Sequence, residues 1–306
     1  MQNHKYLANI FTGVLGIILF NTANASENGT PTTAPGLYDF GAGFLPPATP
    51  NGAWGFRTSY YSAHKNVSAS GEKINDPFSL NVLAPSIAWI KMTQYQVFGA
   101  NYGFGVVQPF FDMDMVLTLP TPIGNLTLKD KVFRQADLQL IPVILGWNIA
   151  PNFAVNAQFQ IQAPTGDYEK NRLISPGLNH WVFSPILNAT YITSTGFEAS
   201  SSLQTDLSTR NKATDYQNGV EYRYEFAMGQ HVNNWTIGLG GYYYNQFTND
   251  KNAFGDVGKS KVFAYGPTIN YFGGKGPSFW LHAYKEQDAT MRSEGYNVAL
   301  RVAQSF

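Results

Sequence analysis

The sequence predicts an all-β fold, a transmembrane antiparallel β-barrel of about 12 strands preceded by a cleaved signal peptide. Three observations support this prediction. The chain begins with an export signal, its later segments alternate apolar and polar residues with a period of two, and no segment after the signal is apolar for long enough to be a membrane helix. Together they predict a protein of the bacterial outer membrane, surrounded by its lipid.

The first 25 residues have the layout of a secretory signal. His4 and Lys5 give a short basic start, Ile10–Phe20 is an apolar run broken only by Thr12, and Ala23–Ala25 is a small-x-small cleavage site. The run has 11 residues, and a membrane helix needs about 20. We therefore assign residues 1–25 to a signal peptide and 26–306 to the mature chain; a retained membrane anchor is the alternative.

The composition of the chain limits its functional class. It is 15% aromatic and 13% charged, whereas soluble domains have about 25% charged residues. Removing Lys5 with the signal leaves 19 basic and 20 acidic residues, so charge gives no reason to expect a nucleic-acid partner. The chain has no cysteine, which excludes disulfides and thiolate metal sites. No metal or other cofactor is expected.

Residues 26–52 are rich in Gly, Pro and Thr and are too broken by proline for a central strand. Two interpretations stay open: a loose N-terminal tail, or a segment that lies in the barrel lumen as a partial plug.

From residue 53 to 306 the period is two, which assigns this range to the barrel. In Phe153–Ala163 one face is apolar and the other is mostly amide, and Phe197–Leu207 and Val220–Met228 alternate in the same way. Weaker alternation predicts nine further strands, at Trp54–Ser62, Leu80–Met92, Asn101–Leu117, Gln135–Trp147, Gly177–Thr193, Trp235–Gln246, Val262–Tyr271, Ser278–Glu286 and Gly295–Phe306.

Two of these strands change the phase of their apolar positions at a proline. Apolar residues are at even positions before Pro109 and at odd positions after it, and a similar change surrounds Pro142. A bulge turns all later side chains to the other face, and proline is tolerated in strands mainly at bulges and edges. We expect a bulge or kink at both prolines.

The last strand alternates down to a C-terminal Phe306. This ending resembles the signal that the bacterial barrel-assembly machinery reads, and it makes that machinery an expected partner. Gln304 departs from the pattern, since an apolar residue is usual there.

An ordered set of short motifs also resembles a known family. They are Ala163–Tyr168, Asn171–Arg172, Pro176–Trp181, Pro185, Asn211–Gly219, Gly240–Gln246, Tyr265–Pro267 and Phe306. The set resembles the outer-membrane transporter family associated with the meta-pathway of phenol degradation, over roughly Pro35 to the end. The resemblance implies a barrel that takes up small hydrophobic or aromatic compounds. From the residues alone, Pro164–Asp167 and Thr214–Gly219 are interpreted as turn and loop-packing motifs ahead of ligand contacts.

No motif for catalysis is found. The five histidines have no metal-ligand spacing, and no Gly-x-Ser-x-Gly or phosphate loop occurs. An outer-membrane phospholipase is the enzymatic alternative, but no histidine has a serine two residues later. A structural barrel without transport is the other alternative.

The candidate solute-path residues are polar side chains expected to face the lumen. They are Asp112 and Asp114, the amides Asn156, Gln158 and Gln160, and the stripe Glu221, Arg223 and Glu225. They could set the field along a solute path, or only brace the wall through salt bridges. The aromatic clusters Tyr60–Tyr61 and Tyr242–Tyr244, with Trp54, are expected to form girdles at the membrane interfaces. Stacking of an aromatic solute on inward members such as Tyr242 and Tyr244 is the alternative.

Overall fold

A computed structural model describes residues 27, 32, 34–74, 77–274 and 276–306. The predicted signal peptide, residues 1–25, lies outside the described residues. Among those described, no helix is long and apolar enough to span a membrane.

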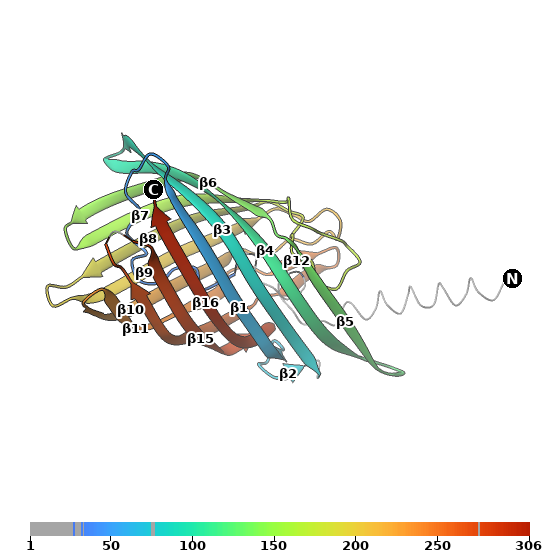
Figure 1. The fold of residues 1–306 in the computed structure, drawn as a ribbon. Coiled ribbons are helices and arrows are strands. Elements are labelled where there is room, and N and C mark those ends of the chain that lie inside the picture. The colour runs from blue at the N-terminus through green and yellow to red at the C-terminus, as the bar shows by residue number, and fades with distance from the viewer. Residues whose placement is uncertain (1–26, 28–31, 33, 75–76, 275) are drawn as a thin grey trace.

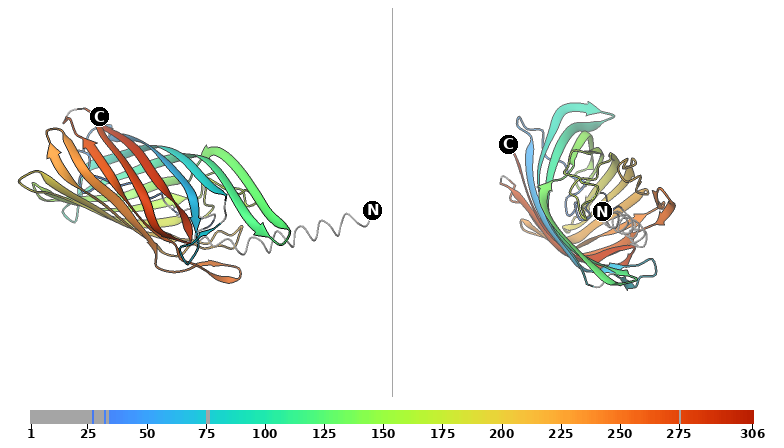
Figure 2. Two further views of the ribbon diagram at one scale, coloured as in Figure 1. Left: turned by 90° about the horizontal axis from the view of Figure 1, so that it is seen from below. Right: turned by 90° about the vertical axis from the view of Figure 1, so that its right-hand side faces the viewer.

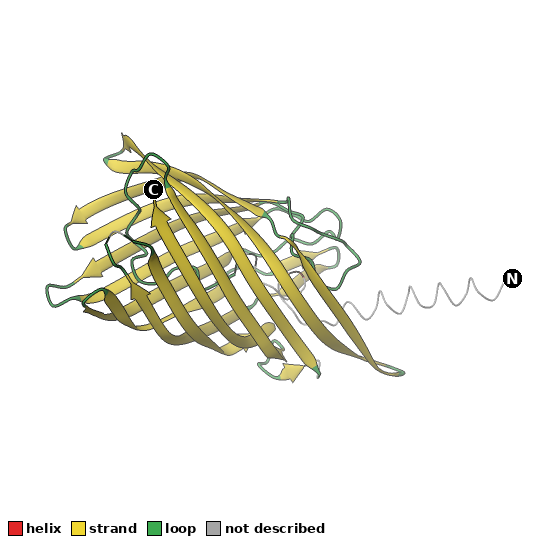
Figure 3. Cartoon of the chain, in the orientation of Figure 1, coloured by secondary structure: helices red, strands yellow, loops and turns green. Residues whose placement is uncertain are grey.

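Antiparallel strands dominate the structure (Figures 1 and 3). Twelve of them form the wall, which closes because the first strand pairs with the last, Ala53 opposite Ser305. The prediction of a 12-stranded barrel is confirmed. The wall strands are β1 (Ala53–Val67), β3 (Phe78–Val97), β4 (Ala100–Thr121), β6 (Leu138–Ala150), β7 (Phe153–Ala163), β8 (Val182–Ile192), β9 (Phe197–Ser208), β10 (Glu221–Val232), β11 (Trp235–Gln246), β14 (Lys261–Tyr271), β15 (Ser278–Thr290) and β16 (Arg292–Ser305).

Four strands lie outside this cycle: β2 (Lys73–Ile74) pairs with β1, β12 (Asp250–Asn252) pairs with β13 (Gly255–Gly258), and β5 (Gly124–Gln135) pairs with β4. The β4–β5 hairpin extends past the neighbouring strands (Figure 1).

The two ends of the barrel have connections of different length. At one end the strands join through tight turns, such as Phe98–Gly99, where both residues have positive φ of 51° and 73°. At the other end residues 164–181, 209–220 and 247–260 form long loops. Bacterial barrels place short turns on the periplasmic side and long loops outside. The long loops and the β4–β5 hairpin are therefore on the extracellular side.

The phase change at Pro142 is a bulge, as predicted. Between Leu140 and Val143 the pairing with β7 shifts by one residue, and the pairing with β4 shifts at the same place.

Of the bulge or kink expected at Pro109, the bulge is wrong, because β3 and β4 pair from Leu83–Asp112 to Ser86–Pro109 without a shift. Odd residues of β4 point inward on both sides of the proline. What changes is the interior, which is apolar next to the second half of the strand, so that Met113 and Met115 are buried there.

In the view along the barrel axis, the wall of strands surrounds loop segments (Figure 2, right). Outward side chains of the last strand, such as Tyr296 and Leu300, are exposed to 43% and 39%, and the inward Asn297 and Ala299 to 4%. Alternation along this strand therefore separates a lipid-facing surface from the barrel interior.

Candidate functional site

The N-terminal segment runs through the lumen and is bound there by carboxylates of β10. Glu225 accepts hydrogen bonds from the backbone N–H groups of Gly36 (2.9 Å) and Tyr38 (2.6 Å). Glu221 accepts bonds from the N–H (3.1 Å) and the hydroxyl (2.5 Å) of Thr32. Both glutamates are almost completely buried, and they bind backbone that pairs with no strand in the described part of the chain.

Asp39 fixes the middle of the segment to β15, which is three strands along the wall from β10. Its carboxylate accepts bonds from Nδ1 of His282 (3.0 Å) and from the hydroxyl of Tyr284 (2.7 Å). Burial alone raises the pKa of Asp39, but the His282 and Arg301 charges and these two bonds outweigh it and hold that pKa well below its usual range. Asp39 is therefore ionised at neutral pH and stays bound to β15.

A close approach at Gly43 fixes the far end of the segment. A Cβ at Gly43 would lie 2.4 Å from the carbonyl oxygen of Ala154 and 2.4 Å from the backbone nitrogen of Thr190. The Asn156 amide donates to the carbonyls of Ala42 (2.9 Å) and Gly43 (3.0 Å). The segment therefore touches the wall strands β7 and β8 directly.

Because no side chain fits at Gly43, we expect Gly43→Val to displace the segment from the wall. Hydrogen exchange of residues 34–47 should become faster by roughly tenfold or more, equivalent to about 1.4 kcal/mol. The control is Ala48→Val, an exposed position in the same segment. Equal protection in both variants would show that the segment is not held at Gly43.

The predicted inward face of β7 and β10 surrounds this segment. Gln158 donates to Oδ1 of Asn156 (3.0 Å), and Gln160 is buried with its Nε2 unbonded. Arg223 forms a buried ion pair with Asp206 on β9 (3.1 Å). The predicted polar side chains of β7 and β10 therefore lie close together inside the barrel. They bind the N-terminal segment and form the Arg223–Asp206 ion pair.

Asp112 and Asp114 are placed elsewhere, and the expectation that they line the lumen is wrong. They alternate with the inward Met113 and Met115, so they lie on the outer face of β4. The Asp114 side chain is 50% exposed and its carboxylate lies 4.0 Å from the Lys131 ammonium on β5. The sequence pattern misled because here the polar residues face outward on the extracellular extension.

The girdle interpretation also fails for three tyrosines. Tyr242 and Tyr244 are 0% and 1% exposed inside the barrel, and the hydroxyls of Tyr61 and Tyr242 both donate to Glu286 at 2.8 Å. Trp54, Tyr60 and Tyr243, in contrast, are exposed to 49%, 40% and 38% on the outer surface, as a girdle requires.

The wall has a break between β5 and β6. The N-terminal part of β4, Asn101–Val107, pairs with β6, whereas its later part, Phe110–Thr121, pairs with β5. Strand β7 pairs with β6 and β8, and β5 pairs with β4 alone, so the second edge of β5 has no strand partner in the described structure. At the break Ala136 donates its N–H to the carbonyl of Pro109 (3.0 Å).

Asp137 binds the loop 164–181 over the break in the wall. The sequence analysis did not identify this residue. Its buried carboxylate accepts bonds from the N–H groups of Gly166 (2.8 Å) and Leu178 (2.9 Å) and from the Gln162 amide (3.2 Å). A Cβ at Gly166 would lie 2.8 Å from the Asp137 backbone nitrogen. The motifs at 163–168 and 176–181 therefore form a latch over the break. An acid near the start of the predicted strand Gln135–Trp147 was the signal available.

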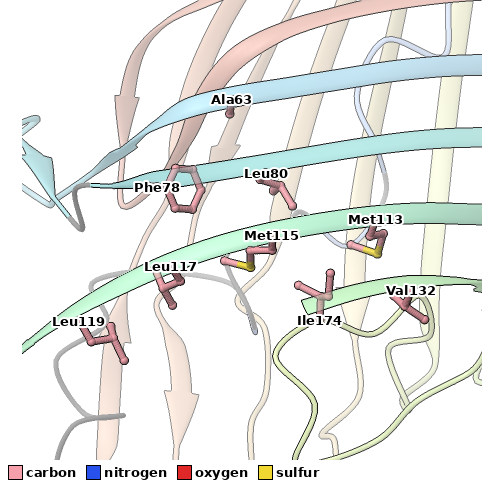
Figure 4. Close-up of a cluster of buried hydrophobic side chains, with 9 residues drawn as sticks. All are labelled: Ala63, Phe78, Leu80, Met113, Met115, Leu117, Leu119, Val132 and Ile174. Atoms are coloured by element: carbon pink, nitrogen blue, oxygen red, sulfur yellow. The ribbon is translucent and has the colours of Figure 1, made fainter. Parts of the chain in front are cut away.

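The same loop completes an apolar cluster under the β4–β5 hairpin. Ile174 is 1% exposed, and Asp130 of β5 accepts bonds from the N–H groups of Leu173 and Ile174. Figure 4 shows the buried side chains of this cluster, which are Ala63, Phe78, Leu80, Met113, Met115, Leu117, Leu119, Val132 and Ile174.

An apolar cavity of about 160 Å³ lies between this cluster, the N-terminal segment and the wall break. Its apolar side is formed by inward residues of β3 and β4, which are Leu80, Val82, Ala84, Val107, Phe111 and Met113. Pro109, Ala136 and Asp137 of the break line it, and Arg57 and Ser59 of β1 form part of its polar side. The described residues contain no group of three or more His, Cys, Asp or Glu side chains that could hold a metal ion.

Comparison with protein families agrees with the resemblance noted in the sequence. Residues 63–302 match the model of the family described as "MetA-pathway of phenol degradation". The chain belongs to this family. No curated protein matches it.

Solved structures support the fold. The COG4313 outer membrane channel from Pseudomonas putida F1 has a TM-score of 0.73 at 13% identity, covering 87% of this chain and 98% of that one. The transport unit of the autotransporter AIDA-I from Escherichia coli has a TM-score of 0.52 at 12% identity, covering 87% and 95%. The CymD monoaromatic hydrocarbon channel has a TM-score of 0.50 at 9% identity, covering 84% and 89%. The fold of this family member is thus that of outer-membrane barrels.

Proposed function

We propose that this family member is an outer-membrane channel for the passive uptake of small hydrophobic or aromatic compounds. The observation that carries the proposal is the apolar cavity that lies inside the barrel and against the wall break. A channel that conducts only water and ions does not need an apolar lining of this kind.

The path that fits the geometry leaves the lumen sideways. The N-terminal segment occupies the barrel axis and is hydrogen-bonded to several wall strands, as a plug would be. The cavity instead continues to Pro109 and Ala136, where the strand pairing changes. An apolar solute gains free energy by moving from water to the cavity, and then to lipid, by about 25 cal/mol per Å² of apolar surface. No energy source is required for such downhill movement.

The comparisons with known proteins support the class of solute that we propose. The family description refers to phenol degradation, and the CymD structure is described as a channel for monoaromatic hydrocarbons. We assign no catalysis to the chain. Insertion into the outer membrane would use the barrel-assembly machinery, with the strand that ends at Phe306 as its signal.

Filling the cavity tests the proposal. Ala84 is inward and 8% exposed, and it lines the cavity, whereas its neighbour Leu83 points to lipid and is 43% exposed. We expect Ala84→Trp to reduce the uptake of labelled toluene by about tenfold at low concentration, a barrier increase of about 1.4 kcal/mol. Leu83→Trp is the matched control and should keep normal uptake.

The assay compares a deletion strain with strains that carry each variant, and it includes phenol, a long alkane and a polar sugar. If the deletion strain and the complemented strain take up all four compounds equally, the channel assignment is wrong and a structural barrel becomes the better interpretation.

A further inference from the structure

Arg57 lies on the polar side of the cavity without a charged partner. A guanidinium has five N–H donors. The described structure gives Arg57 two acceptors, and both are neutral: Oγ of Ser59 (3.1 Å) and the carbonyl of Gly36 (2.8 Å). Among the described residues, no carboxylate oxygen lies within 4.0 Å of its nitrogens.

The other interior arginines are satisfied differently. Arg223 pairs with Asp206 at 3.1 Å, and Arg292 pairs with Glu286 at 3.0 Å. Arg301 lies over the Trp280 ring at 4.1 Å and does not line the cavity. The acids that attract Arg57 through space, Asp39 and Glu225, are bonded to other groups. Arg57 is thus the cavity-lining arginine that is outside any ion pair in the described structure.

The strand register places Arg57 level with the wall break. Arg57 pairs with Ser86 of β3, and Ser86 pairs with Pro109 of β4. Adjacent strands are about 4.8 Å apart, so Arg57 and Pro109 are separated by about 10 Å along the wall. The inward side chains beside this row include the apolar Ala84 and Phe111. A short molecule could therefore have a polar head at Arg57 and an apolar body directed to the break.

We propose that Arg57 binds the carboxylate of small amphiphilic acids, with an aromatic or short aliphatic body, and so makes them the preferred solutes of the channel. This inference rests on the proposed function. A guanidinium binds a carboxylate through two parallel hydrogen bonds and adds charge attraction. A hydrocarbon fills the apolar side of the cavity but leaves the free N–H groups of Arg57 without an acceptor, which costs affinity.

The test uses benzoate as the acid and toluene as the matching hydrocarbon. In Arg57→Met the stem remains and the charge is lost. We expect its uptake of labelled benzoate at low concentration to fall by about tenfold or more, with toluene uptake changed by less than about twofold. Equilibrium dialysis of labelled benzoate against the purified full-length protein should show the same loss of binding. Arg57→Lys should recover only part of it, because a lysine lacks the planar fork.

Arg301→Met is the matched control, because it also removes an arginine that contacts the N-terminal segment, through the Leu37 carbonyl. It should leave the benzoate-to-toluene ratio unchanged. Benzoate and toluene uptake falling together in Arg57→Met, or neither falling, would overturn the role of Arg57. Wild-type uptake of toluene without benzoate would refute the acid preference and keep the channel, whereas uptake of neither solute would refute the channel itself.

Discussion

Deletion of residues 34–47 is expected to convert the barrel into an open aqueous pore. The segment fills the lumen and is held by Glu225, Asn156 and Asp39 contacts to three parts of the wall. Without it, the polar side chains of β7, β9 and β10 would line a continuous water path. We expect single-channel conductance in planar bilayers to rise by about tenfold, and liposomes with the variant to become permeable to small sugars.

The wall should survive this deletion, because its strand pairing does not use the segment. Ala48→Val serves as the control, with wild-type conductance expected. A deletion variant that folds, as judged by the heat-dependent shift in its gel migration, but conducts like the wild type would show that the segment is not what blocks the axis.

Asp137→Ala is expected to open the latch and destabilise the long-loop end of the barrel. Three donors lose their acceptor, two of them backbone N–H groups of residues 166 and 178. Leaving buried N–H donors without an acceptor costs about 1–3 kcal/mol. The expected results are a clear decrease in Tm and rapid protease cleavage within residues 164–181.

Asp114→Asn provides the control, since this carboxylate lies on the outer face and is half exposed. Its Tm should remain within about 1 °C of the wild type, in line with the small contribution of exposed ion pairs. If Asp137→Ala resists protease as well as Asp114→Asn does, the loop is held by packing of Ile174 and not by the latch.

The wall could be predicted from the sequence because a strand with one polar and one lipid-facing side must alternate with period two. This rule located β7, β9 and β10 and assigned Glu221, Arg223, Glu225 and Asn156 to the correct face. It failed at Asp112 and Asp114, because next to them the interior is apolar and the outer surface is extracellular. Alternation reports that two faces differ, but not which face is inside.

Two further features depend on contacts between distant residues. The latch joins Asp137 to Gly166 and Leu178, and the lumenal segment joins Gly36 to Glu225, so neither is encoded in a local pattern. Strand β5 was missed because Asp130 interrupts its apolar positions, and the structure shows why: this acid faces inward to bind the loop backbone. Local sequence predicts elements well, but not the polar bonds that connect them.

The lumenal segment also has a consequence for how the chain acquires its structure. The residues that anchor it precede the first strand, yet their bonds to β10 span 189 residues and those to His282 span 243. The final seam, β1 with β16, joins the two ends of the wall. The segment can therefore reach its partners before this seam closes, or through the short-turn end of the closed barrel, where it joins β1 at Ala53. Contacts of such long sequence separation form slowly, so docking of the segment in the lumen is expected to be a slow step of assembly.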